Sequence, residues 1–594
     1  MRLALRKRWI GIGFLGLVFV LCSVWSRADN RQPEDTVRRH LQQMIGETAA
    51  AGAVADAFLD VEGLRIPLHR HLPDFYRRRD FNPAWTDAQG RVSVVAWQWL
   101  DRIQGVAAEG LDPRDYHVGV LAASLEAAHV SRAYEVDCEP AGLALIDLLL
   151  TDSFLKYVSQ LFPSGDDAAG AGMEGAKVAV ADAVSVLNQV LRRQQVGAVL
   201  DALASERAGY RRLLVYLEHY RRLDLAGGWP VLDDGPPVAL GQRDSRLPAL
   251  RRVLALVGDL DAAALSSGQV MDRVTAEALK RFQARHGLRP DGVLGQQTLA
   301  QINVPVVRRI EQITVNLERE RWPDRDVGAR YLQVDITDFH LSVFDSGIEV
   351  MRMPVVVGTS FRRTPVFSAL MTYLVFAPYW TVPPTILQQD KLPLIKANPN
   401  YLKAHHYEIV AWGKDPDRTI DPRGINWKQV TAETFPGLLR QKPGPWNPLG
   451  RVKFMFPNAY HVYLHDTPSR HLFEEQQRTF SSGCIRIARP LDLAVFLLEG
   501  QQGWSKERVA REMARSRPYT VYLERPLPVH ILYRTAWVDT RGRLQFRNDI
   551  YEKDSELLGA LRQRSVPSEN DGNAPGPKND ALNSEQDGVR PMVR

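Results

Sequence analysis

The chain carries the stretch Tyr463-Leu464-His465-Asp466-Thr467-Pro468, followed by Ser481-Ser482-Gly483-Cys484-Ile485-Arg486. Cys484 is one of only three cysteines in 594 residues. A thiol becomes a useful nucleophile near neutral pH when a base or a positive charge favours its thiolate, and His465 is the candidate base. Small residues before the thiol let main-chain N–H groups approach a reacting carbonyl and stabilise its oxyanion. The two stretches therefore predict a cysteine-dependent acyl-transfer site.

The sequence around Cys484 favours chemistry over packing. A lone cysteine is usually a small buried hydrophobe. However, Ser481, Ser482 and Gly483 before it and Arg486 after it are not core residues. We therefore interpret Cys484 as the nucleophile, supported by Ser481, and expect the main-chain N–H groups from Ser482 to Cys484 to cover the oxyanion.

The histidine stretch predicts a strand, because His461, Tyr463 and His465 would share one face and the apolar residues between them the other. A strand would hold the two histidines roughly 13 Å apart, and no further ligand set accompanies them. We therefore expect neither a metal nor another cofactor. Two further residues each have two possible roles. Tyr463 could orient His465 or line the cleft, or it could be an aromatic that packs across strands. Arg486 could bind a substrate carboxylate, or it could form a structural salt bridge.

These residues resemble the signature of the L,D-transpeptidases, which have a YkuD-type catalytic domain. The resemblance makes His465 the general base, Cys484 the nucleophile and Arg486 the arginine of the motif. Ser482 stands where most members have histidine. Three further phrases resemble the long, periplasmic branch of the family: Val375 to Pro384, Leu449 to Asn458 and Thr535 to Asp539.

The resemblance implies a substrate and a reaction. The donor would be a peptidoglycan tetrapeptide stem, cut between its third-position diaminopimelate and the terminal D-alanine. The acceptor would be the diaminopimelate side-chain amine of another stem, which gives a 3→3 cross-link. Family members are also acylated by carbapenems at this cysteine. Other cell-wall synthases are candidate protein partners.

The sequence leaves three other functions open. Water as the acceptor would make the protein an L,D-carboxypeptidase. A cysteine endopeptidase of the cell wall is disfavoured, because papain-like enzymes place the cysteine before the histidine and here His465 precedes Cys484. A non-catalytic wall-binding scaffold is disfavoured because His465, Gly483, Cys484 and Arg486 are all present.

Composition and the amino terminus indicate an exported globular protein. Hydrophobic residues make up 45% and charged residues 24%, and the length predicts two to four domains. The net charge is +6, and the basic residues form no continuous stripe that would indicate nucleic-acid binding. Basic residues precede an apolar run from Trp9 to Trp25, so residues 1–28 are expected to be a signal peptide or a retained anchor. This predicts a periplasmic location, next to the inner membrane only if the signal is retained. Cys138 is interpreted as structural.

The chain is predicted to be a multidomain α+β protein. Residues 29–240 read as a helical scaffold, whose acidic residues and His69 and His71 are interpreted as solvated surface. Residues 308–322 read as a linking helix. Residues 328–555 read as a β-rich catalytic domain, interrupted at about 383–445 by an irregular insertion interpreted as a cap over the site. Residues 565–594 read as a disordered tail.

Residues 246–304 are expected to form a compact helical unit. Val274, Ala278, Leu279 and Phe282 are placed on one helical face, and Gly287 is placed to cap that helix. The phrases in this segment resemble the three-helix peptidoglycan-binding module.

Overall fold

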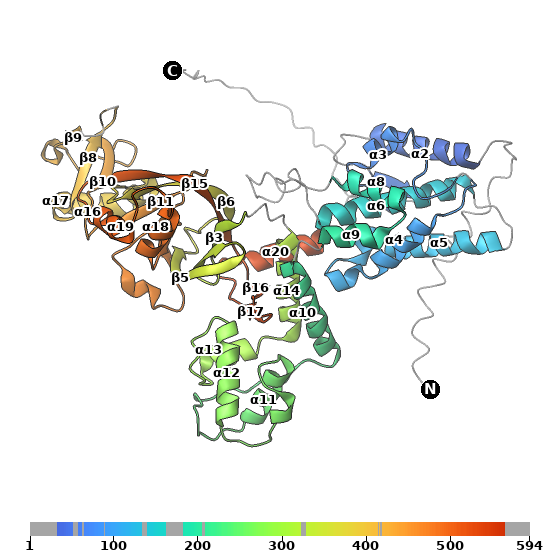
Figure 1. Cartoon of the computed structure of the whole chain (residues 1–594), viewed down its shortest axis with the longest axis horizontal. Coiled ribbons are helices and arrows are strands. Elements are labelled where there is room, and N and C mark those ends of the chain that lie inside the picture. Colours follow the sequence, from blue (N-terminus) through green and yellow to red (C-terminus); the bar gives the residue numbers. More distant parts are fainter. Residues whose placement is uncertain are drawn as a thin grey trace, which may run out of the picture.

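The computed structural model describes residues 33–50, 58–61, 64–87, 89–133, 139–161, 182–204, 208–321, 328–413, 415 and 418–564. The expected signal segment 1–28, Cys138 and the expected tail 565–594 lie outside the described residues. Figure 1 shows a helical region and a β-rich region at opposite ends of the molecule, with the small helical unit α11–α13 projecting from between them. The expected α+β organisation is confirmed.

The amino-terminal region is built of helices around α6, which is buried along most of its length. A helix that is apolar on most sides must lie inside its domain. No helix among the described residues combines the length and the apolar character needed to cross a membrane. The elements of this region are α2 (Pro33–Ala50), β1 (Phe58–Val61), β2 (Leu64–Pro67), α3 (Leu72–Arg78), α4 (Val94–Gln104), α5 (Val118–Ala133), α6 (Pro140–Leu161), α8 (Ala183–Arg193), α9 (Val196–Ala204) and α10 (Ala208–Leu225).

Two aspartates of α6 contradict the expectation that acidic residues of this region are solvated. Asp147 and Asp152 are fully buried. Asp147 accepts the main-chain N–H of Trp85 at 2.7 Å and of Ala84 at 2.9 Å, and the hydroxyl of Tyr76 at 2.7 Å. A buried carboxylate is tolerated only when such partners replace water. The interpretation as surface was wrong because these partners lie far from α6 in sequence.

Asp152 makes a second buried polar centre. It accepts the main-chain N–H of His69 at 2.5 Å and the ring of His117 at 2.7 Å, and it pairs with Lys156 at 2.7 Å. The ring of His69 also contacts Ser159 Oγ at 3.0 Å. His69 and His71 are both half-buried, so their interpretation as solvated surface was wrong.

The small unit consists of α11 (Leu247–Leu256), α12 (Arg273–Arg285) and α13 (Gln296–Ile302). Ala278, Leu279 and Phe282 lie in its core as expected, but Val274 is 54% exposed. Thr275 is buried instead, since its main-chain N–H is capped by Asp272 and its hydroxyl contacts Arg251. The next helix, α14 (Val306–Arg321), corresponds to the expected linking helix.

The β-rich region is a nine-stranded sheet that closes on itself. The strand order is β13-β5-β14-β12-β11-β6-β15-β3-β4, and β4 also pairs with β5. One buried apolar cluster fills this sheet and includes Leu493, Ala494 and Leu498 of the following helix α18. The elements are β3 (Arg330–Asp335), β4 (His340–Asp345), β5 (Ile348–Gly358), β6 (Phe367–Phe376), β11 (Val452–Met455), β12 (Leu464–His465), β13 (Thr479–Ser481), β14 (Ile485–Ile487), α18 (Pro490–Leu498), α19 (Lys506–Met513) and β15 (Tyr519–Leu532).

The insertion is regular, which contradicts the expected irregular chain. Four short antiparallel strands pair in the order β7-β10-β8-β9. These strands and the short helices of the insertion share an apolar cluster of their own, separate from that of the large sheet. The sequence pattern was misleading because each element is only two to six residues long, too short for a clear period. The elements are β7 (Trp380–Thr381), α15 (Pro384–Ile386), the π-helical turn η5 (Leu387–Lys391), α16 (Leu392–Ala397), α17 (Tyr401–Ala404), β8 (Tyr407–Ala411), β9 (Thr419–Ile420) and β10 (Gly437–Gln441).

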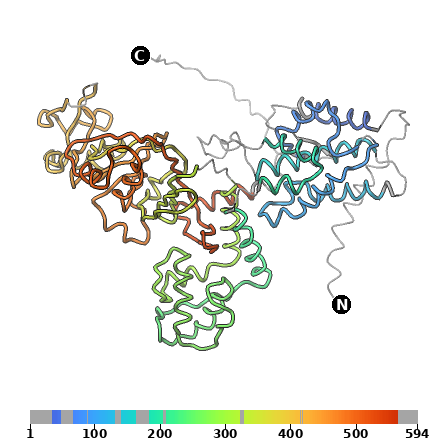
Figure 2. Tube along the Cα trace, viewed as in Figure 1, coloured from blue at the N-terminus to red at the C-terminus, as the bar shows by residue number. Residues whose placement is uncertain are grey.

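The carboxyl-terminal segment leaves the large sheet and returns to the helices. The hairpin β16 (Ala536–Val538) and β17 (Leu544–Phe546) belongs to the same buried cluster as α10 and α14. Figure 2 shows this segment, in red, beside the green trace of α14. The helix α20 (Lys553–Arg564) follows. The chain is thus tied at both ends of the β-rich region to the linking helix.

We expect Asp147→Ala to destabilise the helical region by at least about 2 kcal/mol, because buried N–H and O–H donors would lose their acceptor. Hydrogen exchange measured by mass spectrometry should become faster in peptides that contain Ala84 and Trp85. Asp74→Ala is the control, since Asp74 is exposed and pairs only at the surface with Arg77. Equal exchange rates in the two variants would contradict the assigned role of Asp147.

Candidate active site

Strand pairing brings the two predicted stretches together. The strand β12 pairs in parallel with β14, with Leu464 opposite Ile485 and His465 opposite Arg486. On its other side β12 pairs with β11, which puts Lys453 opposite His465. Residues opposite one another point to the same face of a sheet. Lys453, His465 and Arg486 therefore form one row across three strands.

The next row contains the thiol. Ile485 donates its main-chain N–H to the carbonyl of Tyr463 at 3.1 Å, so Cys484 lies beside Tyr463. Cys484 and His465 are then diagonal neighbours on one face, with Cα atoms roughly 7–8 Å apart in an ordinary sheet. Leu464 and Ile485 are fully buried in the core on the opposite face.

The strand is shorter than the sequence indicated. It covers only Leu464–His465, and His461 has φ +55° and lies outside it. The side chain of Asn458 accepts the main-chain N–H groups of Tyr460 and Val462 and donates to the carbonyl of Val462. Such side-chain bonds compete with strand pairing and form a turn. The prediction of a strand that runs from His461 to His465 was therefore wrong at its amino-terminal end.

Cys484 is half-buried and forms no disulfide with any residue that the structure describes. Its Sγ lies 4.0 Å from the carbonyl oxygen of His461. Burial raises the pKa of the Cys484 thiol, while hydrogen bonds from Tyr463 and the charges of Lys453 and Arg486 lower it. Burial outweighs the other causes, so the pKa of the thiol is raised overall, and the two cations and the phenol that face the sulfur only limit that rise.

His465 is buried and uncharged. Its Nδ1 lies 2.6 Å from the carbonyl oxygen of Asp466, and because that oxygen can only accept, the proton sits on Nδ1. Burial, followed by the positive charge of Arg486, lowers the pKa of His465 to about 3. Hydrogen bonding to the carbonyls of Asp466 and Pro448 acts in the opposite direction but is outweighed. A neutral ring with this tautomer can accept a proton at Nε2 but cannot supply positive charge to the thiolate.

The loop before the thiol is internally bonded. The main-chain N–H of Gly483 donates to Ser481 Oγ at 3.1 Å, and Ser481 is buried. The hydroxyl of Ser482 is exposed and accepts from Arg362 at 3.0 Å. Because the Gly483 donor is engaged, the expected oxyanion contacts depend on the main-chain N–H groups of Ser482 and Cys484.

Tyr463 and Arg486 both lie against the site. Hydrogen bonding to Cys484 ties the Tyr463 hydroxyl to the sulfur, and the Tyr463 and His465 rings are 5.8 Å apart in an edge-on arrangement. The Nε of Arg486 is buried without a hydrogen-bond partner among the described residues. An unpaired buried donor on a cation is costly unless something else satisfies it. The described part of the chain holds no group of three or more potential metal-ligating side chains.

Lys453 and Arg362 also lie at the site and were not predicted from the sequence. Lys453 stands between the buried Val452 and Phe454, so a charged residue in an apolar alternation was an available signal. Its Nζ lies 5.4 Å from the centre of the Tyr463 ring. Arg362 had no such signal, because its contacts with Ser482 and with Asp390 of the insertion, both at 3.0 Å, come from distant segments.

Comparison with known proteins identifies three parts of the chain. Residues 329–509 match the family model for the L,D-transpeptidase catalytic domain, YkuD. Residues 70–217 match the model described as a scaffold domain. Residues 244–302 match the model described as "Putative peptidoglycan binding domain".

A single relative matches a smaller part of the chain than the three family models together. A protein of Haemophilus influenzae described as "Putative L,D-transpeptidase" is 33% identical over 248 residues. These are 42% of this chain and 49% of that protein, so the match spans about half the length of the relative.

Solved structures with similarity include an L,D-transpeptidase from Stackebrandtia nassauensis, 14% identical with a TM-score of 0.20, which covers 51% of this chain and 97% of that one. Another, from Mycobacterium smegmatis, is 13% identical with a TM-score of 0.17 and covers 34% and 58%.

The match of residues 329–509 coincides with the sheet that carries Cys484 and His465. The match of residues 244–302 coincides with the helices α11 to α13. This chain therefore contains an L,D-transpeptidase catalytic domain of the YkuD family and a peptidoglycan-binding domain.

Proposed function

We propose that the protein is a peptidoglycan L,D-transpeptidase that forms 3→3 cross-links through a thioester on Cys484. The observation that carries this proposal is the half-buried thiol, which faces Lys453, Tyr463 and Arg486 within a domain that matches the L,D-transpeptidase family. A thiol in this setting is suited to nucleophilic catalysis.

In the first half-reaction Cys484 takes an acyl group from a tetrapeptide donor stem. His465 Nε2 receives the thiol proton, and Sγ attacks the carbonyl carbon of the third-position diaminopimelate. The main-chain N–H groups of Ser482 and Cys484 stabilise the oxyanion. The C–N bond to D-alanine then breaks, His465 returns the proton to the leaving amine, and a thioester remains.

In the second half-reaction the side-chain amine of another stem attacks the thioester. The new amide bond forms as the C–S bond breaks, and the proton of the attacking amine returns to the thiolate by way of His465. Water in place of the amine would release a free tripeptide stem, which is the carboxypeptidase reaction. Arg486 supplies a guanidinium for a substrate carboxylate, consistent with its unpaired buried Nε.

The remaining parts of the chain would position the catalytic domain at the cell wall. We assign peptidoglycan binding to residues 246–304, a scaffold role to residues 29–240 and the linking role to residues 308–322. The catalytic domain is taken as residues 328–555, with the insertion at about 383–445 as a cap. These assignments imply a location at the cell wall, in the periplasm if residues 1–28 act as an export signal, and allow other cell-wall synthases as partners.

We expect the purified wild-type protein to convert disaccharide-tetrapeptide into cross-linked dimers with release of D-alanine. Cys484→Ala should form no dimers, because the covalent route is lost. Chromatography of the muropeptides with mass spectrometry measures both products. Dimers formed by the alanine variant would remove Cys484 from the mechanism, and tripeptide without dimers would favour the carboxypeptidase.

Incubation with a carbapenem should add the mass of one inhibitor molecule to the intact wild-type protein. The adduct should be absent from Cys484→Ala, because acylation requires the thiol. Intact-mass spectrometry is the measurement. A wild-type protein that binds isolated peptidoglycan but forms no adduct would favour the non-catalytic wall-binding scaffold.

Alkylation of Cys484 by iodoacetamide should accelerate as the pH rises through and above neutrality, because burial raises the pKa of the thiol. No step is expected between pH 5 and 8 from His465, whose pKa is about 3. Lys453→Met should shift the profile upward by roughly one pH unit, since a nearby cation stabilises the thiolate. Lys506→Met, on the exposed side of α19, is the control. Superimposable profiles for Lys453→Met and wild type would contradict the role of Lys453.

A further inference from the structure

The peptide unit between Gly483 and Cys484 is held by a buried threonine. Thr364 is fully buried, and its Oγ1 donates to the carbonyl oxygen of Gly483 at 2.8 Å. A trans peptide is planar, so its carbonyl oxygen and its N–H point in opposite directions. Fixing the oxygen of Gly483 therefore fixes the direction of the Cys484 N–H, one of the two proposed oxyanion donors. Gly483 has φ +110°, which only glycine adopts without strain.

Thr364 has no freedom to turn its hydroxyl elsewhere. Its Oγ1 accepts the main-chain N–H of Gly358 at 2.9 Å, so the single hydroxyl proton is left for Gly483. A Cβ on Gly358 would lie 2.1 Å from the carbonyl oxygen of Arg362, which shows how closely the loop returns on itself. The loop also contacts the nucleophile segment through Thr359, whose N–H donates to the carbonyl of Ser481 at 3.1 Å.

Tyr551 anchors this loop from the carboxyl-terminal segment. Its hydroxyl donates to the carbonyl of Gly358 at 2.6 Å and accepts the main-chain N–H of Thr364 at 3.3 Å. The Tyr551 ring is 1% exposed and stacks on Tyr533 with ring centres 5.7 Å apart. The hydroxyl of Tyr533 in turn accepts the main-chain N–H of Tyr551 at 2.8 Å and donates to Asp549 at 2.5 Å.

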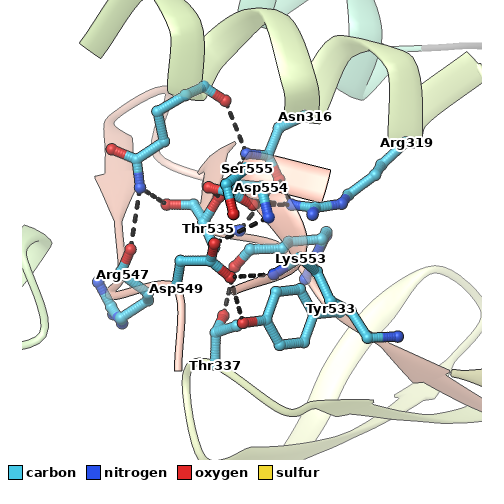
Figure 3. Close-up of polar contacts among 12 residues, drawn as sticks. Asn316, Arg319, Thr337, Tyr533, Thr535, Arg547, Asp549, Lys553, Asp554 and Ser555 are labelled. Carbon is cyan, nitrogen blue, oxygen red and sulfur yellow. Dashed lines mark hydrogen bonds and ion pairs between the residues drawn. The ribbon is translucent and has the colours of Figure 1, made fainter. Parts of the chain in front are cut away.

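The chain of hydrogen bonds ends on the linking helix α14. Asp549 accepts the first main-chain N–H groups of α20, including that of Asp554 at 2.8 Å. Asp554 accepts the hydroxyl of Thr535 at 2.6 Å and pairs with Arg319 of α14 at 2.6 Å. Figure 3 shows these side chains and Asn316, which exchanges two hydrogen bonds with Thr535. The anchor of Tyr551 is thus fixed to a helix outside the catalytic sheet.

We propose that Thr364 and Tyr551 are positioning residues for the acyl transfer at Cys484. Thr364 sets the Gly483–Cys484 peptide so that its N–H faces the oxyanion, and Tyr551 holds Thr364 in place. This deepens the proposed function and rests on its nucleophile. It also makes the segment after residue 509, where the match to the catalytic family model ends, a necessary part of the site.

The test compares two reactions of the same thiol in the full chain. Acylation by p-nitrophenyl acetate passes through a tetrahedral oxyanion, forms acetyl-Cys484 and releases p-nitrophenolate. Alkylation by iodoacetamide is a direct displacement of iodide and needs no oxyanion donor. Thr364→Val removes only the hydroxyl at nearly constant shape, Tyr551→Phe does the same for the phenol, and Thr364→Ser restores the hydroxyl. Thr520→Val and Tyr522→Phe, at exposed positions of β15, are matched controls.

We expect Thr364→Val to slow acylation roughly 10- to 100-fold, as for a misplaced catalytic group, while alkylation changes by less than about threefold. Tyr551→Phe should show a smaller loss of the same kind, and Thr364→Ser should recover most of the acylation rate. Equal slowing of both reactions, or of neither, would overturn the positioning role.

The same assay separates this inference from the function on which it rests. Wild-type protein that acylates with the ester but forms no muropeptide dimers would contradict the proposed transpeptidase while leaving the positioning effect measurable. Wild-type protein whose Cys484 does not acylate at all would overturn both.

Discussion

The parallel pairing of β12 with β14 is the contact on which the candidate site depends. It sets Leu464 beside Ile485 in the core and, on the opposite face, His465 beside Arg486 with Cys484 one row away. Register is strongly specified here, because a slip by one residue would expose the two apolar side chains and bury the polar ones. The same hydrophobic requirement that stabilises the sheet therefore also aligns the reactive groups.

The charges around the thiol differ from those of a simple cysteine–histidine ion pair. The imidazole of His465 is neutral, since burial and its cationic neighbours lower its pKa to about 3. Positive charge comes instead from Lys453 and Arg486, which flank the imidazole on neighbouring strands. The two functions are therefore carried by different groups. The permanent cations lower the cost of forming the thiolate, while the neutral imidazole with its fixed tautomer can still exchange a proton.

Rigidity of the site comes from outside the catalytic sheet. The hydrogen bonds from Gly483 through Thr364 and Tyr551 reach α20 and the linking helix α14, and Thr364 and Tyr551 are themselves buried. Such a network is stable only when every polar group has its partner. The hairpin β16–β17 packs against α10 and α14 in the same region. The loop before Cys484 is therefore connected through hydrogen bonds and an ion pair to the helices α20 and α14.

The sequence alone determined the local features of the protein: the α+β organisation, the buried helical face of Ala278, Leu279 and Phe282, and the stretches around His465 and Cys484. These follow from side-chain periodicity and from local motifs, which act over a few residues. Only the tertiary structure decided that Asp147 and Asp152 are buried, that the insertion has its own sheet, that Lys453 faces the thiol, and that Thr364 and Tyr551 support the loop before it. The physical reason is that burial, charge proximity and hydrogen-bond partnership depend on segments far apart in the chain, 71 residues for Tyr76 and Asp147 and 193 for Gly358 and Tyr551, which no local pattern encodes.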